Sequence, residues 1–252
     1  MLWLAALSIL IVSLVSFVGL LTISIKIERL RRILFALISL SVGALLGDVL
    51  LHILPELNPI TPTVTTFIFV GFLIFFILEK FLRWHHGHEG EVHEDDVEMD
   101  PGHDTHHVGY LNLFSDGLHN FIDGLVIGGA YLVSIEVGIA TTIAVILHEI
   151  PQEIGDFGLL LHVGFSRSRA LAFNFFSALA SFLGLLVVII LQSQSVGLID
   201  IILPITAGGF IYIAGSDLVP ELHKTSDAKK SLIQLISIII GFAFMGLLTI
   251  FE

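Results

Sequence analysis

Apolar stretches of about twenty residues dominate this chain and leave little room for a soluble fold. Hydrophobic residues make up 55% of its 252 residues, charged residues make up only 13%, and the mean hydropathy is +0.97, values typical of membrane proteins. A helix of about 20 residues crosses a hydrocarbon core of about 30 Å. We therefore predict an all-α, polytopic membrane protein, a single transmembrane domain over residues 1–252 with eight crossings, at 2–25, 33–57, 63–84, 109–134, 138–164, 168–192, 197–222 and 230–251.

The basic residues support this count, because cytoplasmic connections of membrane proteins collect Lys and Arg. All eleven lie in or beside the connections after predicted segments 1, 3, 5 and 7: Lys26, Arg29, Arg31, Arg32, Lys80, Arg83, Arg167, Arg169, Lys224, Lys229 and Lys230. The connections after segments 2, 4 and 6 contain none. We therefore expect both termini to be non-cytoplasmic.

One region interrupts the apolar pattern, at residues 85–108. It is rich in histidine and in acidic residues, a composition typical of a disordered cytoplasmic loop. Its imidazoles could chelate a cation weakly, and a solvated acidic linker with incidental histidines is the alternative. The chain has no cysteine, so disulfides and thiolate metal ligands are excluded.

A faint internal repeat relates residues 41–57 to residues 206–222, and the two copies end in Ile-Leu-Pro-Glu-Leu and Leu-Val-Pro-Glu-Leu. The two segments run in opposite directions in the predicted topology. An inverted repeat of this kind is common in secondary transporters. It predicts a 3+2+3 arrangement in which segments 4 and 5 lie between two halves, while a chance match between apolar segments is the alternative.

Ionisable residues occur near the middle of segments 4 and 5, where a charge costs about 2.5–3.5 kcal/mol or more in lipid. His119, Asn120 and Asp123 lie on one face of segment 4. Segment 5 carries a polar stripe that begins at His148 and Glu149 and continues through Gln152, Glu153 and Asp156. Two facing stripes of imidazole and carboxylate indicate a bound metal ion. A polar network that only holds the helices together is the alternative.

Pro151 lies within this stripe and cannot donate a hydrogen bond to the carbonyl of Leu147. We expect a kink there and a free carbonyl that protein, water or a cation must satisfy.

The motifs His119-Asn-Phe-Ile-Asp-Gly124 and His148-Glu-Ile-Pro-Gln-Glu-Ile-Gly-Asp-Phe157 resemble the ZIP family of divalent-cation transporters, and most closely its branch with His-Glu-x-Pro-His-Glu on the fifth helix. The resemblance implies transport of zinc, or of iron, manganese or cadmium, towards the cytoplasm through a binuclear site. It further implies a homodimer and an elevator-like movement, and it implies no nucleic-acid partner. Carried over position by position, it gives as metal ligands His119, Asn120, Asp123, His148, Glu149 and Gln152, with Glu153 nearby.

The chain departs from this branch at Gln152, where relatives usually have a second histidine. An amide is a poorer metal ligand than an imidazole, so we expect a weaker second metal site. We expect no enzymatic activity and a place in the cell (inner) membrane.

Two other functions fit the same residues less well. An intramembrane zinc hydrolase would use His148 and Glu149 as the start of a His-Glu-x-x-His motif, but Gln152 replaces its second histidine. A membrane-bound metal sensor would bind ions through the histidine-rich loop without moving them.

Overall fold

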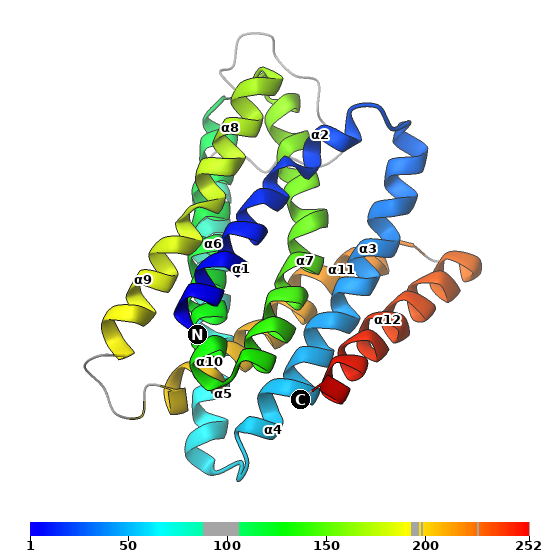
Figure 1. Cartoon of the computed structure of the whole chain (residues 1–252). Helices are drawn as coiled ribbons and strands as arrows, with labels where there is room; N and C mark the ends of the chain where they lie inside the picture. The colour runs from blue at the N-terminus through cyan, green and yellow to red at the C-terminus, as the bar shows by residue number, and fades with distance from the viewer. Residues whose placement is uncertain (88–105, 193–196, 198, 226, 252) are drawn as a thin grey trace.

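The computed structural model describes residues 1–87, 106–192, 197, 199–225 and 227–251, and these residues form helices and short connections with no β-strand (Figure 1). The predicted loop at 85–108 falls largely outside the described residues, although its two ends continue the flanking helices. The α-helices are α1 (Leu2–Val15), α2 (Gly19–Thr22), α3 (Ile27–Asp48), α4 (Leu54–Glu56), α5 (Pro62–Gly87), α6 (His106–Val133), α7 (Ile135–His162), α8 (Arg167–Ala178), α9 (Ala180–Gln192), α10 (Ile199–Tyr212), α11 (Val219–His223) and α12 (Ala228–Leu248). Short 3₁₀-helices, η1 (Ser16–Val18) and η4 (Thr249–Phe251), and π-helices, η2 (Val49–Ile53) and η3 (Ile213–Leu218), extend or join them. The all-α prediction is confirmed.

Five helical stretches are long and apolar enough to cross a membrane, at Leu2–Thr22, Glu28–Glu56, Arg167–Gln192, Ile199–His223 and Ala228–Leu248. The polytopic membrane class is therefore confirmed. Helices α6 and α7 are not among the five, and they are the helices that carry the two polar motifs. The predicted number of eight crossings stays a prediction, although each predicted segment coincides with a helical stretch whose ends differ by a few residues.

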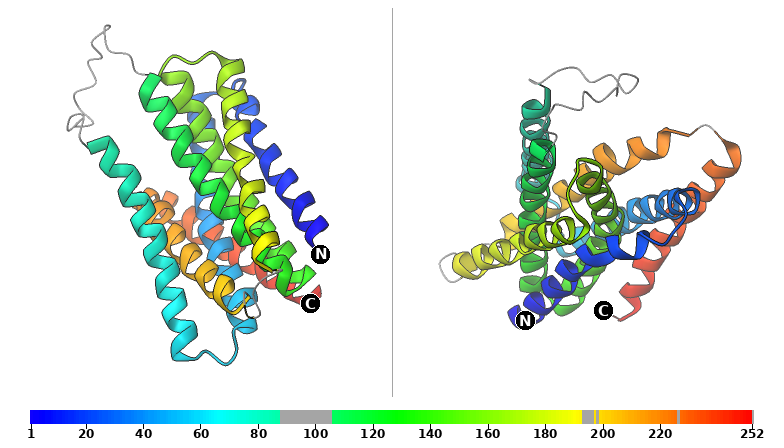
Figure 2. Two further views of the ribbon diagram at one scale, coloured as in Figure 1. Left: turned by 90° about the vertical axis from the view of Figure 1, so that its left-hand side faces the viewer. Right: turned by 90° about the horizontal axis from the view of Figure 1, so that it is seen from above.

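The two motif helices lie side by side and are enclosed by the others (Figures 1 and 2). A single residue, Ser134, separates them, and its hydroxyl oxygen caps α7 by accepting a hydrogen bond from the amide of Val137. Helix α7 packs against α1, α3 and α8, while α6 packs against α9 and α10. The fold therefore buries the polar faces of α6 and α7 inside the protein and keeps them away from lipid.

Reciprocal glycines set three of the closest helix crossings. A Cβ atom at either glycine of a pair would overlap a backbone carbonyl of the other helix. The pairs are Gly43 with Gly241 between α3 and α12, Gly71 with Gly208 between α5 and α10, and Gly124 with Gly184 between α6 and α9. Small residues at such crossings let helix backbones approach closely, which favours association in lipid.

The two halves of the internal repeat share an unusual backbone feature. Each contains a π-helix, η2 or η3, directly before a Pro-Glu pair. Pro55 and Pro220 have no amide hydrogen for the carbonyl one turn earlier, and a widened turn accommodates this loss. Gly43 and Gly208 also occupy equivalent positions in the two copies. These shared features make a chance match a poor explanation, and the inverted 3+2+3 arrangement itself stays a prediction.

Helix α7 continues through Pro151, and the carbonyl that this proline leaves without a donor is satisfied by protein. The hydroxyl of Ser41 on α3 lies 2.6 Å from the carbonyl oxygen of Leu147, and 2.8 Å from that of Leu37 on its own helix. The single hydroxyl hydrogen can serve either carbonyl. The contact with Leu147 links α3 to α7 and offers this carbonyl a donor from the protein.

Gly241→Ala tests the role of the close crossings. The added Cβ would overlap the carbonyl oxygen of Leu40, so α12 must move away from α3. We expect a loss of about 1–3 kcal/mol in the free energy of unfolding, as for other overpacked sites. This loss is measured by heating the detergent-purified protein and using gel filtration to follow how much folded protein remains.

Gly246→Ala is the matched control on the same helix. Its added Cβ would lie 3.5 Å from Leu51 Cδ1, which is ordinary contact, and alanine favours a helix over glycine by about 1 kcal/mol. The control should keep or slightly raise the unfolding temperature. Equal effects of the two substitutions would contradict the packing argument.

Candidate metal centre

Four side chains from α6 and α7 converge on one point, and we call them the histidine group: His119, Asp123, His148 and Glu149. One ligand atom from each lies within 4.8 Å of the other three. Asp123, His148 and Glu149 have side chains only 1% exposed, and His119 is 17% exposed. Three of the four side chains are therefore buried, and His119 is partly accessible.

The distances within the histidine group match a metal ion better than a set of hydrogen bonds. His119 Nε2 lies 3.3 Å from both His148 Nε2 and Glu149 Oε1. Asp123 Oδ2 lies 3.5 Å from His148 Nε2 and 3.7 Å from His119 Nε2, and Glu149 Oε1 lies 3.6 Å from His148 Nε2. Four ligands at zinc bond lengths of about 2.0–2.2 Å in a tetrahedron lie about 3.3–3.6 Å apart. Four of these five contacts fall within this range and the fifth, at 3.7 Å, is slightly longer, so the spacing is compatible with a zinc ion.

The orientation of His148 also suits a metal ligand. Its Nδ1 lies 3.1 Å from the carbonyl oxygen of Ala144, which can only accept a hydrogen bond. The proton of the neutral ring therefore sits on Nδ1, and the lone pair of Nε2 points into the histidine group. Metal-binding histidines are commonly held in this way.

A second set of acidic side chains, the carboxylate group, shares one residue with the first. It consists of Asp116, Glu149 and Glu153, whose oxygens lie within 4.8 Å of one another. Asn174 on α8 donates a hydrogen bond from Nδ2 to Glu153 Oε2 at 2.8 Å. Because Glu149 belongs to both groups, its carboxylate could bridge two ions.

Apart from histidine, these carboxylates have no basic counterpart on their own helices, since the sequence contains no Lys or Arg between residues 84 and 166. Several of their oxygens are buried and accept no hydrogen bond from the described part of the chain: Asp116 Oδ2, both oxygens of Asp123, Glu149 Oε1 and Glu153 Oε1. Buried carboxylates normally need a cation, a proton or donors. These buried carboxylates could therefore bind positive charge that the described residues do not supply.

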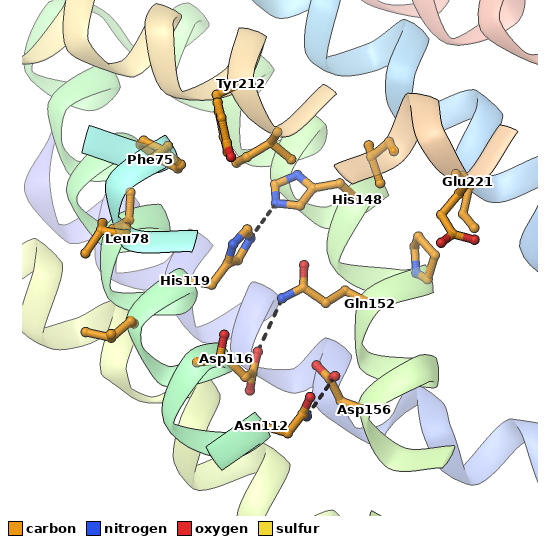
Figure 3. Close-up of a pocket in the computed structure, with 17 residues that line it drawn as sticks. Phe75, Leu78, Asn112, Asp116, His119, His148, Gln152, Asp156, Tyr212 and Glu221 are labelled. Atoms are coloured by element: carbon orange, nitrogen blue, oxygen red, sulfur yellow. Dashed lines mark hydrogen bonds between the residues drawn. The ribbon is translucent and has the colours of Figure 1, made fainter. Parts of the chain in front are cut away.

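A cavity of about 510 Å³ leads away from the histidine group (Figure 3). His119 and His148 lie at one part of its wall, and Asp116, Asn112 and Asp156 continue the polar wall towards the start of α6 and the end of α7. Apolar side chains such as Phe75, Leu78 and Ile122 form much of the remaining lining. A small polar cation could thus enter or leave the histidine group from this side.

The structure brings the seven residues predicted from the sequence into one region. His119, Asp123, His148 and Glu149 form the histidine group, and Glu153 joins the carboxylate group. The other two predicted residues are Asn120 and Gln152, and both donate hydrogen bonds to Asp116 Oδ1. The donor Asn120 Nδ2 lies at 2.9 Å and the donor Gln152 Nε2 at 3.4 Å.

Two residues of the region were absent from the predicted set. Asp116 lies one turn before His119, a spacing that could have identified it. Asn174 lies on α8. The one sequence signal for it is that a polar residue occurs within an apolar segment.

The family model described as ZIP Zinc transporter matches residues 1–108 and 84–249. The chain is 35% identical over 252 residues to "Zinc transporter YKE4" of Saccharomyces cerevisiae, covering 88% of this chain and 73% of the relative. It is 35% identical over 277 residues to "Zinc transporter ZIP13 homolog" of Drosophila melanogaster, covering 86% and 78%. With "Metal cation symporter ZIP14" of Xenopus tropicalis the identity is 32% over 294 residues, covering 88% and 63%.

All of these names describe transporters, so the comparison does not favour the hydrolase alternative. The resemblance to the ZIP family is confirmed, and the closer likeness to the branch with His-Glu-x-Pro-His-Glu stays a prediction. The match extends over nearly the whole chain and includes both helices of the candidate metal centre. The chain belongs to the ZIP zinc transporter family.

Proposed function

We propose that this protein carries divalent transition-metal ions, zinc foremost, across a membrane towards the cytoplasm. The observation that supports this most directly is the histidine group, in which two imidazoles and two carboxylates from adjacent helices place their ligand atoms within 4.8 Å of one another. Imidazole favours zinc, and also iron, manganese or cadmium, over magnesium and calcium. The names of the relatives point to the same class of ion.

The proposed ligands are His119, Asn120, Asp123, His148, Glu149, Gln152 and Glu153. One ion would bind in the histidine group, and a second would bind in the carboxylate group with Glu149 as the shared ligand. The buried Oδ1 of Asn120 accepts no hydrogen bond from the described residues and is free to join the second site. Gln152 contributes an amide where related proteins have imidazole, so the second site should be the weaker one.

The proposed direction of transport rests on the basic residues and on the cavity. The cavity extends towards the end of α7, where Arg167 and Arg169 follow, and this is the side predicted to be cytoplasmic. The marked termini lie towards the opposite end of the molecule from the start of α6 (Figure 2), which is compatible with the proposed orientation. Access would alternate by movement of α6 and α7 against α3 and α10, within eight crossings arranged as an inverted repeat.

The family likeness also leads us to propose a homodimer in the cell membrane. Helix α12 exposes a row of large apolar side chains, including Leu232, Leu235, Ile239 and Leu247, which suits contact with lipid or with a second copy.

His148→Ala tests the transport site. Changing a residue that only hydrogen-bonds to a metal ligand typically lowers metal affinity by about 10–100-fold. His148 is itself a proposed ligand, so its removal should lower zinc affinity by more than this. Uptake of radioactive zinc into proteoliposomes should fall to background. His162→Ala, at the exposed end of the same helix, should keep the uptake of the unchanged protein. Normal uptake by a folded His148→Ala protein would contradict the proposal.

Gln152→His tests the departure from related proteins. An imidazole at this position should strengthen zinc binding at the second site, because it is the better ligand. Calorimetric titration with zinc should show a higher affinity or an additional bound ion, and Gln152→Leu, which removes the amide, should show neither. Unchanged stoichiometry and affinity in Gln152→His would count against Gln152 as a ligand.

A further inference from the structure

The turn of α7 that carries His148 and Glu149 lacks one backbone hydrogen bond of its own helix. Pro151 has no amide hydrogen, so the carbonyl of Leu147 receives no bond from the residue one turn later. Leu147 directly precedes the two residues that α7 contributes to the histidine group. A donor from another helix at this carbonyl would therefore act on the backbone next to the metal centre.

Ser41 on α3 is placed to be that donor. Its Oγ lies 2.6 Å from the carbonyl oxygen of Leu147, and the residue has no exposed surface. Water therefore does not reach the hydroxyl, and its hydrogen bond must go to a protein acceptor. The contact joins two helices that pack against each other although the two residues are far apart in the sequence.

The Ser41 hydroxyl has a second acceptor on its own helix. The carbonyl oxygen of Leu37, four residues earlier, lies 2.8 Å from Ser41 Oγ, and this is a common partner for a serine within a helix. Because the hydroxyl has one hydrogen, it donates either to Leu147 or to Leu37 at a given moment. The hydroxyl stays paired in both arrangements, and only the Leu147 carbonyl gains or loses a donor.

A second hydrogen bond between α3 and α7 fixes how the two helices face each other. Thr141 Oγ1 on α7 donates to Asp48 Oδ2 on α3 at 3.0 Å. Asp48 follows Ser41 by seven residues on α3. Thr141 precedes Leu147 by six residues on α7, so the two contacts lie about 10 Å apart along antiparallel helices. Apolar residues without exposed surface occupy the stretch between them: Ala44, Leu45, Ala144 and Val145. This packing keeps Ser41 opposite the proline turn.

We propose that Ser41 is a positioning residue of the metal centre. By donating to the Leu147 carbonyl, its hydroxyl holds the proline turn of α7 against α3 and keeps the two α7 ligands within the histidine group. The arrangement that binds zinc is the one in which the hydroxyl serves Leu147, and the free protein also populates the one in which it serves Leu37. Ser41 acts through the backbone of α7 and not by contact with the ion. This role rests on the proposed function of the histidine group.

Ser41→Ala tests this role in the purified full-length protein. Zinc affinity is measured by competition with a zinc-chelating dye, and the binding that is lost in His148→Ala is assigned to the histidine group. One uncharged hydrogen bond changes an equilibrium constant about fivefold, so Ser41→Ala should weaken zinc binding by about that factor. Ser39→Ala is the matched control, because Ser39 lies on the same helix, has no exposed surface and donates to the Phe35 carbonyl at 2.8 Å. The bond that it loses lies within α3, so its zinc affinity should stay within about twofold.

Ser41→Thr and Ser41→Val separate the hydroxyl from the space that the side chain fills. Threonine and valine have nearly the same shape, but only threonine has a hydroxyl that can donate a hydrogen bond. The Ser41→Thr protein should therefore bind zinc about fivefold more tightly than the Ser41→Val protein. Equal zinc affinities of these two folded variants, or an equal loss in Ser41→Ala and Ser39→Ala, would overturn the positioning role.

Pro151→Ala tests whether Ser41 acts through the Leu147 carbonyl. This substitution supplies the amide hydrogen that the carbonyl lacks, so it should make the Ser41 hydroxyl redundant. Adding Ser41→Ala to Pro151→Ala should then weaken zinc binding by less than about twofold, in contrast to its effect in the unchanged protein. A cavity left by Ser41→Ala would weaken binding equally in both backgrounds, and that result would count against the proposal. If Pro151→Ala alone abolishes zinc binding, the comparison of Ser41→Thr with Ser41→Val decides.

Failure of this proposal is distinguishable from failure of the transport function. Absence of zinc uptake by the unchanged protein in proteoliposomes would contradict transport, whatever the zinc affinities of the Ser41 variants. Normal uptake together with equal zinc affinities of Ser41→Ala and the unchanged protein would contradict only the role of Ser41.

Discussion

The structure depends on keeping buried negative charge inside a membrane protein without lysine or arginine on the helices that carry it. Asp116, Asp123, Glu149 and Glu153 are almost completely buried, and α6 and α7 contain no Lys or Arg. Such an arrangement is unstable in lipid unless positive charge arrives from elsewhere. A protein that must release its cation cannot fix this charge permanently with lysine or arginine, because a covalently attached cation would occupy the site. The lack of basic residues is therefore what a reversible cation site requires.

The surrounding helices make this arrangement possible. Helices α6 and α7 do not have the continuous apolar surface of the other long helices, so they need protein around them. Close crossings at paired glycines join α3 to α12, α5 to α10 and α6 to α9. Gly43 of the first pair and Gly208 of the second occupy equivalent positions in the internal repeat. The third pair joins α6 to α9. The Ser41 hydroxyl that contacts the Leu147 carbonyl ties α7 to α3 at the one turn where proline interrupts the helix.

The polar residues of α6 and α7 form two groups that share Glu149. The histidine group combines nitrogen and oxygen atoms within 4.8 Å of one another, and the carboxylate group contains oxygen atoms only. For the proposed transport function this difference matters, because imidazole ligands favour zinc-like ions while strong binding slows release.

The sequence by itself determined the helical class, the helix positions to within a few residues, and the residue types of the metal centre. These follow from local rules: apolar length predicts a membrane helix, and spacings of three and four residues place His119 and Asp123, or His148 and Gln152, on one helical face. Only the tertiary structure decided how the two faces meet. It placed His119 Nε2 near Glu149, made Glu149 part of two groups, and brought Asn174 from α8 to Glu153. It also placed the hydroxyl of Ser41 on α3 within hydrogen-bonding distance of the Leu147 carbonyl. Contacts between helices depend on the rotation and separation of whole helices, and those are set by packing at distant glycines that local spacing does not reveal.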